Sequence, residues 1–255
     1  MSAIRLGTRA STLATTQSEM VAGLLRSEGL DVNLTTITTH GDTSTASLAA
    51  MGGIGVFASA IRAALLEGEA DIAVHSFKDL PTGRPLGLAI GAVPARADPR
   101  DALVARDGLT LHDLPQEASV GTGSPRRAAQ LLAVRPDLTI VDIRGNVDTR
   151  LGRVKGLGRY AKNGGKEDLD AVVLAASGLA RLGHSGAVTE FLDPSVVLPA
   201  PAQGALAVEC RTADSRHGKL AKALARIDDR RTRLAATAER AVLSCLLYTS
   251  DAADE

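Results

Sequence analysis

The chain of 255 residues carries 29 lysines and arginines against 29 aspartates and glutamates, so its formal net charge is zero. Hydrophobic residues make up 45% and charged residues 23%, a globular composition that excludes a disordered or fibrous protein. The charge balance and the aromatic content of 2% argue against a protein that coats nucleic acid or an anionic membrane. No segment has the pattern of a signal peptide or a membrane span, and Cys210 and Cys245 cannot form a disulfide framework. We therefore expect a soluble, cytoplasmic protein.

Short β-type runs alternate with longer helical runs in the N-terminal part of the chain. Strands are predicted at Ile4–Thr8, Val32–Thr38, Asp71–His75 and Leu88–Val93. Helices are predicted from about Thr12 to Ser27 and from Phe57 to Leu66, where apolar residues recur at helical spacing. This alternation predicts a mostly parallel sheet with helices on both faces.

The same pattern restarts after a junction near Pro94–Asp101. It predicts a strand that ends at Ser119–Val120, a helix to about Val134, a strand at Leu138–Ile143, mostly helix over Asn146–Tyr160 and a strand at Ala171–Ala175. Val196–Glu209 is expected to form two more short strands, which could return to the first unit, and the pattern from Gly218 onward is helical. The sequence thus predicts two α/β units of similar size.

The segment Ser119-Val-Gly-Thr-Gly-Ser-Pro-Arg-Arg127 joins a predicted strand to a predicted helix. Ser124 is a natural N-cap and Pro125 suits the first helical position, so the turn points free backbone N–H groups toward an anion. Arg126 and Arg127 add two guanidinium groups, which match carboxylates. The alternative is a well-capped helix with solvated arginines. A dinucleotide-binding fingerprint is disfavoured, because Arg126 stands where that motif needs glycine.

Other arginines also follow predicted strands. Arg144 and Arg150 come after the strand that ends at Ile143, Arg9 follows Ile4–Thr8 beside Ser11, and Arg181 follows Ala171–Ala175. Open α/β sheets bind ligands at the carboxyl ends of their strands. Any one arginine alone is equally an ordinary surface residue. Together with Arg126 and Arg127, six arginines are predicted at the carboxyl ends of strands. This number favours a polycarboxylate or phosphate ligand.

The third candidate lies in His75-Ser-Phe-Lys-Asp-Leu-Pro81, where a buried strand delivers Lys78 and Asp79 to the same kind of edge. Asp79 among arginines is either a salt-bridge partner or an acid placed where positive charge develops during a reaction. No metal site is expected, because none of the five histidines has a second ligand at metal spacing.

Seven segments occur in the order of one known family across residues 4–243. They are Ile4–Ser11, Gly52–Phe57, Ala70–Pro81, Arg96–Ala102, Val120–Arg127, Ile143–Arg150 and Gln203–Arg211. Together they resemble the porphobilinogen deaminase (hydroxymethylbilane synthase) family. The resemblance implies an α/β fold of two periplasmic-binding-protein-like (type II) domains around a cleft, followed by a small third α/β domain. Domain 1 would comprise residues 1–97 and about 197–217, domain 2 residues 101–194, and residues 218–255 would lead into a third domain that is largely missing.

The resemblance also implies a transferase of haem and tetrapyrrole biosynthesis, a cytoplasmic monomer with no nucleic-acid or membrane partner. Four porphobilinogen molecules would condense head to tail into hydroxymethylbilane with release of ammonia, on a covalent dipyrromethane cofactor that serves as primer. Asp79 matches the catalytic aspartate. The positions that match cofactor-binding residues are Lys78, Thr122, Ser124, Arg126 and Arg127. Those that would hold substrate or the growing chain are Arg9, Ser11, Arg144 and Arg150, and Arg181 would serve either role.

The C-terminal residues depart from the family pattern. The position of the primer-bearing cysteine falls on Ser250, whereas Cys245 lies several residues early and lacks the preceding glycine. No attachment residue is therefore assigned, and we expect an inactive fragment whose natural reading frame ends at about Ser244. The alternative function is a non-enzymatic binding protein for a small polycarboxylate or oxyanion. The Lys78–Asp79 placement and the lack of a signal peptide weigh against this alternative.

Overall fold

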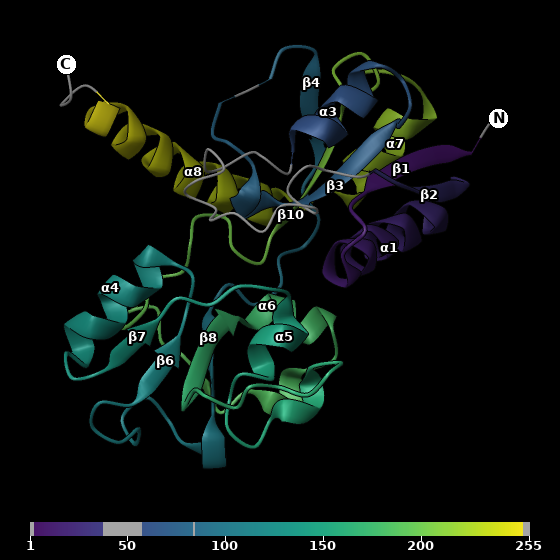
Figure 1. Ribbon diagram of the computed structural model, residues 1–255. Helices are drawn as coiled ribbons and strands as arrows, with labels where there is room; N and C mark the ends of the chain where they lie inside the picture. Colours follow the sequence, from purple (N-terminus) through teal and green to yellow (C-terminus); the bar gives the residue numbers. More distant parts are fainter. Residues whose placement is uncertain (1–2, 38–57, 84, 252–255) are drawn as a thin grey trace. The chain divides into compact units, whose positions relative to one another are not determined.

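A computed structural model describes residues 3–37, 58–83 and 85–251 of the protein. The chain divides into two compact units (Figure 1). Unit 1 comprises Met1–Ala97 and Ala205–Glu255, and unit 2 comprises the single segment Asp98–Gly204. The chain thus leaves unit 1 once and returns to it. The predicted cleft and the predicted third domain stay predictions.

Unit 1 is built on a five-stranded sheet with the order β2-β1-β3-β10-β4. Its strands are β1 (Ile4–Thr8), β2 (Val32–Thr36), β3 (Ile72–Ser76), β4 (Leu88–Ala92) and β10 (Leu206–Arg211). β2, β1 and β3 run parallel, whereas β10 pairs antiparallel with both β3 and β4. The returning chain therefore supplies an interior strand of this sheet.

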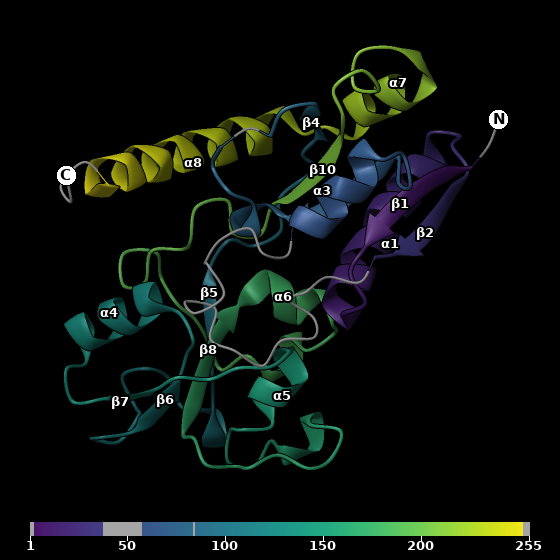
Figure 2. The same ribbon diagram turned by 45° about the horizontal axis from the view of Figure 1, so that its top comes forward.

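Helices cover both faces of the sheet in unit 1. They are α1 (Thr12–Ser27), α3 (Ser59–Leu66) and α7 (Gly218–Ile227), and α8 (Arg230–Asp251) follows α7 along the chain. Leu25 of α1 and Leu224 of α7 share one buried cluster with Leu6 and Val74, while Leu65 of α3 packs in a second cluster. Figure 2 shows α8 beginning beside β4 and extending away from the sheet. No helix among the described residues is long and apolar enough to cross a membrane.

Unit 2 repeats the plan with the strand order β7-β6-β8-β5-β9. Its strands are β5 (Asp101–Ala105), β6 (Ser119–Gly121), β7 (Thr139–Val141), β8 (Ala171–Ala175) and β9 (Glu190–Phe191), and its helices are α4 (Pro125–Val134), α5 (Val147–Leu151) and α6 (Ala176–Arg181). Leu131 of α4 packs on one face, and Leu151 of α5 and Leu179 of α6 pack on the other. Helices on both faces, as predicted, are confirmed in both units.

In each sheet four strands run in one direction, as the prediction of a mostly parallel sheet requires, and one strand, β10 or β5, runs against its neighbours. The structure corrects two other predictions. The predicted helix over Asn146–Tyr160 ends at Leu151 in α5, because the glycines that follow favour turns, and only the short 3₁₀ helix η3 (Gly158–Tyr160) comes later. Within Val196–Glu209 the structure has only β10, since the prolines at 199 and 201 lack the N–H groups that a strand needs.

The strand β5 was not predicted, since its first residue was assigned to the junction between the units. The outer ends of two other predictions, Thr38 and Phe57, lie outside the described residues. The remaining predicted strands and helices are present within one to three residues at each end.

Candidate active site

One edge of the unit 2 sheet collects all the site residues predicted in that unit. β7, β6 and β8 are parallel, so their carboxyl ends meet at this edge, which we call the unit 2 edge. The predicted residues that follow these strands are Thr122, Ser124, Arg126 and Arg127 after β6, Arg144 and Arg150 after β7, and Arg181 at the end of α6, which follows β8. The topology therefore brings five arginines to one edge.

The turn after β6 is held by its own side chains. The Ser124 hydroxyl accepts a hydrogen bond of 3.5 Å from the Arg127 amide and thus caps α4, while the Ser124 amide donates to the Thr122 hydroxyl at 3.2 Å. A Cβ atom on Gly123 would lie 2.7 Å from the carbonyl oxygen of Ile143. Only glycine allows the backbone of this turn to approach the residues after β7 so closely.

Asp101 is a member of this edge that the sequence did not indicate. It begins β5 opposite Ala175, the last residue of β8, so its carboxylate lies at the unit 2 edge. Arg127 Nη2 donates to it at 2.7 Å and Arg126 Nη2 at 2.8 Å, and Gln203 Nε2 adds a third bond at 2.7 Å. Burial raises the pKa of Asp101, but the hydrogen bonds and charges of Arg127 and then Arg126 outweigh it, so the pKa lies below its usual value.

The two arginines of the turn differ in exposure. The side chain of Arg127 is 8% exposed, donates to the carbonyl of Val173 at 3.2 Å, and has no hydrogen-bond partner for its Nε among the described residues. Arg126 is 26% exposed and also donates to the carbonyl of Leu198. Arg126 is thus the more accessible donor, and Arg127 is largely committed to the interior.

Positive charge accumulates beside this turn. Burial lowers the pKa of Arg150, and the charges of Arg127 and Arg144 lower it further, while Asp142 opposes them. Burial also lowers the pKa of Arg181 to about 10, and its Nε is buried with no hydrogen-bond partner in the described part of the chain. Partly desolvated guanidinium groups near like charges favour an anionic ligand.

The unit 1 edge, formed by the carboxyl ends of the parallel strands β1 and β3, gathers the other predicted residues. Arg9 and Ser11 follow β1, and Lys78 and Asp79 lie in the 3₁₀ turn η1 (Phe77–Asp79) directly after β3. The Ser11 hydroxyl accepts from the Ala14 amide at 3.3 Å and so caps α1. Lys78 is half-buried, whereas Asp79 is exposed.

On β10, the strand paired with β3, lies a buried charged group that the sequence did not reveal. Glu209 of β10 is bound in a bidentate way by Arg62 of α3, with distances of 2.9 to 3.1 Å, and its carboxylate lies 3.3 Å from His75 Nε2. Burial raises the pKa of Glu209, but the contacts with His75 and Arg62 lower it by more. His75 is therefore the neighbour of a buried carboxylate in the strand that leads to Asp79.

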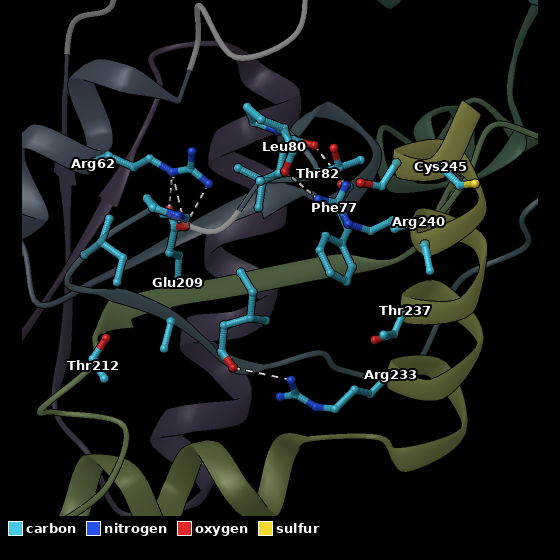
Figure 3. Close-up of a pocket in the computed structure, with 18 residues that line it drawn as sticks. Arg62, Phe77, Leu80, Thr82, Glu209, Thr212, Arg233, Thr237, Arg240 and Cys245 are labelled. Carbon is cyan, nitrogen blue, oxygen red and sulfur yellow. Dashed lines mark hydrogen bonds and ion pairs between the residues drawn. The ribbon is translucent and has the colours of Figure 1, made fainter. Parts of the chain in front are cut away.

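Both candidate positions for cofactor attachment belong to α8. Cys245 is exposed on α8 and lines a cavity of about 910 Å³ in unit 1, shown in Figure 3. The lining of that cavity includes none of the predicted site residues. Ser250 falls within α8.

Comparison with known proteins identifies relatives of both sequence and fold. Residues 4–219 match the family described as "Porphobilinogen deaminase, dipyromethane cofactor binding domain". The porphobilinogen deaminase of Micrococcus luteus is 56% identical over an alignment of 262 positions, which covers 95% of this chain and 70% of the relative. That of Leifsonia xyli subsp. xyli is 58% identical over 246 residues, which cover 96% of this chain and 72% of the relative.

Two solved structures match the fold. One is a periplasmic substrate-binding protein of an ABC transporter from Coxiella burnetii, with a TM-score of 0.50 at 17% identity, covering 91% of this chain and 95% of that one. The other is a nutrient-binding protein from Burkholderia cenocepacia, with a TM-score of 0.50 at 16% identity, covering 87% and 91%. At this identity the match concerns the fold alone, and it confirms the predicted periplasmic-binding-protein-like (type II) architecture.

Proposed function

Because the chain belongs to the porphobilinogen deaminase family, we propose that Asp79 and the arginines of the two sheet edges carry the reaction of that family. This transferase reaction condenses four porphobilinogen molecules head to tail into hydroxymethylbilane and releases ammonia, in the biosynthesis of tetrapyrroles such as haem. The observation that carries the proposal is the accumulation of partly buried positive charge at the unit 2 edge. Each pyrrole brings an acetate and a propionate, so the growing product needs such donors.

The unit 2 edge fits a dipyrromethane in the chemistry of its donors. Arg126 is a partly exposed guanidinium, Arg127 retains an Nε without a partner among the described residues, and Thr122 and Ser124 add hydroxyls beside the N-terminus of α4. These four residues, with Lys78, would hold the cofactor. When bound, the dipyrromethane supplies the pyrrole carbon at which the first condensation takes place.

Cys210 is not proposed as the attachment residue. It is fully buried in β10, and its burial, followed by the charge of Asp214, raises its pKa to about 11. The thiol therefore stays protonated at neutral pH, whereas formation of a thioether needs the thiolate. The attachment role is assigned to no residue of this chain.

The substrate-binding role falls to Arg9, Ser11, Arg144, Arg150 and Arg181, with Arg181 able to serve the cofactor as well. Their task is to pair with carboxylates and to orient the pyrrole rings, which removes much of the entropic cost of bringing two rings together. Arg150 donates a hydrogen bond of 2.8 Å from its side-chain Nε to the Gly145 carbonyl, which leaves its terminal nitrogens for this purpose.

Asp79 would stabilise the positive charge that develops on porphobilinogen as ammonia departs, and would accept a proton from the pyrrole. Its exposed carboxylate on a short turn after a buried strand supports this role, since a fixed negative charge stabilises a developing cation most when it is positioned beforehand.

The non-enzymatic alternative is not favoured, because the enzymes match at 56 to 58% identity and the binding proteins at 16 to 17%. The proposal includes a cytoplasmic monomer without nucleic-acid or membrane partners, supported by the balance of 29 positive and 29 negative residues. Light scattering after size exclusion tests the monomer.

The test of function uses two proteins, since the chain spans about 70% of the length of its relatives. One is the chain itself. The other, called the completed protein, joins to it the part of the Micrococcus luteus relative that the match leaves out. With porphobilinogen, the completed protein should release ammonia and form a product of hydroxymethylbilane mass. A folded completed protein that releases no ammonia, under conditions in which the relative is active, would overturn the proposal.

A further inference from the structure

The turn that carries Asp79 is bound by one side chain of α8, a helix far along the sequence. Arg240 of α8 donates from Nη1 to the carbonyl oxygens of Phe77 at 3.0 Å and Leu80 at 2.8 Å, and from Nη2 to that of Pro81 at 2.5 Å. Its guanidinium carbon also lies 4.6 Å from the centre of the Phe77 ring. Figure 3 shows Arg240 reaching from α8 to Phe77 and Leu80. One guanidinium thus binds the backbone on both sides of Lys78 and Asp79.

Two backbone hydrogen bonds among the described residues also hold the turn. On its N-terminal side the Phe77 amide donates to the Ala205 carbonyl at 3.0 Å. Within it, the Leu80 amide donates to the Phe77 carbonyl at 3.4 Å, which is long for a hydrogen bond. No side chain caps η1. On the C-terminal side of Asp79, Arg240 therefore links the carbonyls of Leu80 and Pro81 directly to α8.

Arg240 is itself well anchored. The preceding residue, Glu239, forms a bidentate ion pair with Arg96, at 2.6 and 2.8 Å. No carboxylate pairs with Arg240 among the described residues, so its donors serve the three carbonyls. Bonds from a charged donor in a partly buried site are stronger and more directional than those between neutral groups.

We propose that Arg240 is a positioning residue for Asp79, which fixes the backbone of the η1 turn and thereby the direction of the Asp79 carboxylate. The catalytic part of this inference rests on the proposed function of Asp79. Arg240 acts through the backbone and touches no reacting atom.

The chain provides a matched control on the same helix. Arg233 lies two turns earlier on α8, pairs with Asp228 at 2.7 Å, and donates to the carbonyls of Ile90 at 3.3 Å and Gly91 at 3.2 Å. It anchors α8 to β4 with the same chemistry but has no recorded bond to the η1 turn. A general loosening of α8 should affect both variants, whereas loss of positioning should affect only Arg240.

Hydrogen exchange of the 255-residue chain tests the structural part. Arg240→Met should speed amide exchange in a peptide covering residues 77–82 by about tenfold, whereas Arg233→Met should leave that peptide unchanged. Arg240→Lys, which keeps one charged donor, should restore part of the protection. Unchanged exchange in Arg240→Met, or an equal rise in the Arg233 variant, would overturn the proposal. Circular dichroism confirms that each variant is folded.

Turnover of the completed protein tests the catalytic part. A small misplacement of a catalytic group costs about 100-fold in rate, so Arg240→Met should lower kcat by about 10- to 100-fold while KM changes less than about threefold. Faster exchange without loss of kcat would overturn the link to Asp79. If the unmutated completed protein is itself inactive, the proposed function fails, and the exchange result still decides whether Arg240 fixes the turn.

Discussion

Asp101 Oδ1 accepts a hydrogen bond of 2.7 Å from Arg127 Nη2, and the two side chains are 0% and 8% exposed. Removing one partner of a buried ion pair leaves the other charge without compensation, at a cost of about 3–5 kcal/mol. Asp101→Asn should therefore lower the free energy of unfolding by about that amount, measured by urea denaturation. Asp107→Asn is the control, because Asp107 is 70% exposed in its pair with Arg106 and such a pair contributes at most about 1 kcal/mol. Equal losses in the two variants would contradict the prediction.

A second prediction concerns the stability of the folded protein at acidic pH. Asp170, immediately before β8, receives bonds from Lys155 Nζ at 2.8 Å, the Ser119 amide at 2.9 Å and Arg106 Nε at 2.9 Å. Burial raises the pKa of Asp170, but these bonds lower it by more, so the folded pKa lies well below the unfolded value of about 4. The stabilisation is thus complete above pH 5 and is lost as the pH falls below about 4.

Urea denaturation at a series of pH values checks the direction of this pH dependence. Below about pH 4 the free energy of unfolding of the wild-type chain should fall by about 1.4 kcal/mol per pH unit more than that of Asp170→Asn. The reason is that the carboxylate of Asp170 takes up a proton in the unfolded state alone. The stability difference between the two proteins should therefore shrink toward low pH. A difference that grows as the pH falls would mean that Asp170 is protonated in the folded protein.

Asp79→Asn should reduce turnover of the completed protein by about 10²- to 10⁴-fold, the usual loss when a positioned acid or base is removed. Because Asp79 is exposed, the melting temperature should change little. The control is Asp31→Asn, an exposed residue just before β2, at the opposite edge of the unit 1 sheet. Ammonia release gives the rate, and an unchanged kcat in Asp79→Asn would remove Asp79 from the mechanism.

The arginines of the unit 2 edge should separate into two groups in the completed protein. Arg126→Leu and Arg127→Leu should fold but fail to assemble the primer, because its carboxylates lose charge-assisted bonds of about 1.5–3 kcal/mol each. Since Arg127→Leu also removes the partner of Asp101, circular dichroism must first show that this variant is folded. Arg144→Leu and Arg150→Leu should carry the primer but elongate it poorly. The mass of the intact protein distinguishes the outcomes, and four variants that all carry and elongate a primer normally would contradict the anion-binding role.

Prediction from the sequence succeeded where local pattern and local chemistry agree. The strand Ala171–Ala175 and the Ser124 cap with Pro125 behind it are specified within a few residues, and the structure has both. Asp101 could not be predicted as a partner of Arg127, because only the register of β5 against β8, opposite Ala175, brings it to the same edge. The hydrogen bonds of Arg240 to the η1 turn join residues about 160 positions apart. No local sequence pattern predicts them either.

The position of β10 between β3 and β4 has a consequence for how the polypeptide acquires its structure during synthesis. Unit 2 is one continuous segment that is complete once residue 204 has left the ribosome, whereas the unit 1 sheet lacks an interior strand until residues 206–211 emerge. Although domains usually fold in order from the N-terminus, here the later segment can fold first. Until residues 206–211 emerge, the edges of β3 and β4 that pair with β10 have unpaired backbone groups, and such edges are open to pairing with other chains.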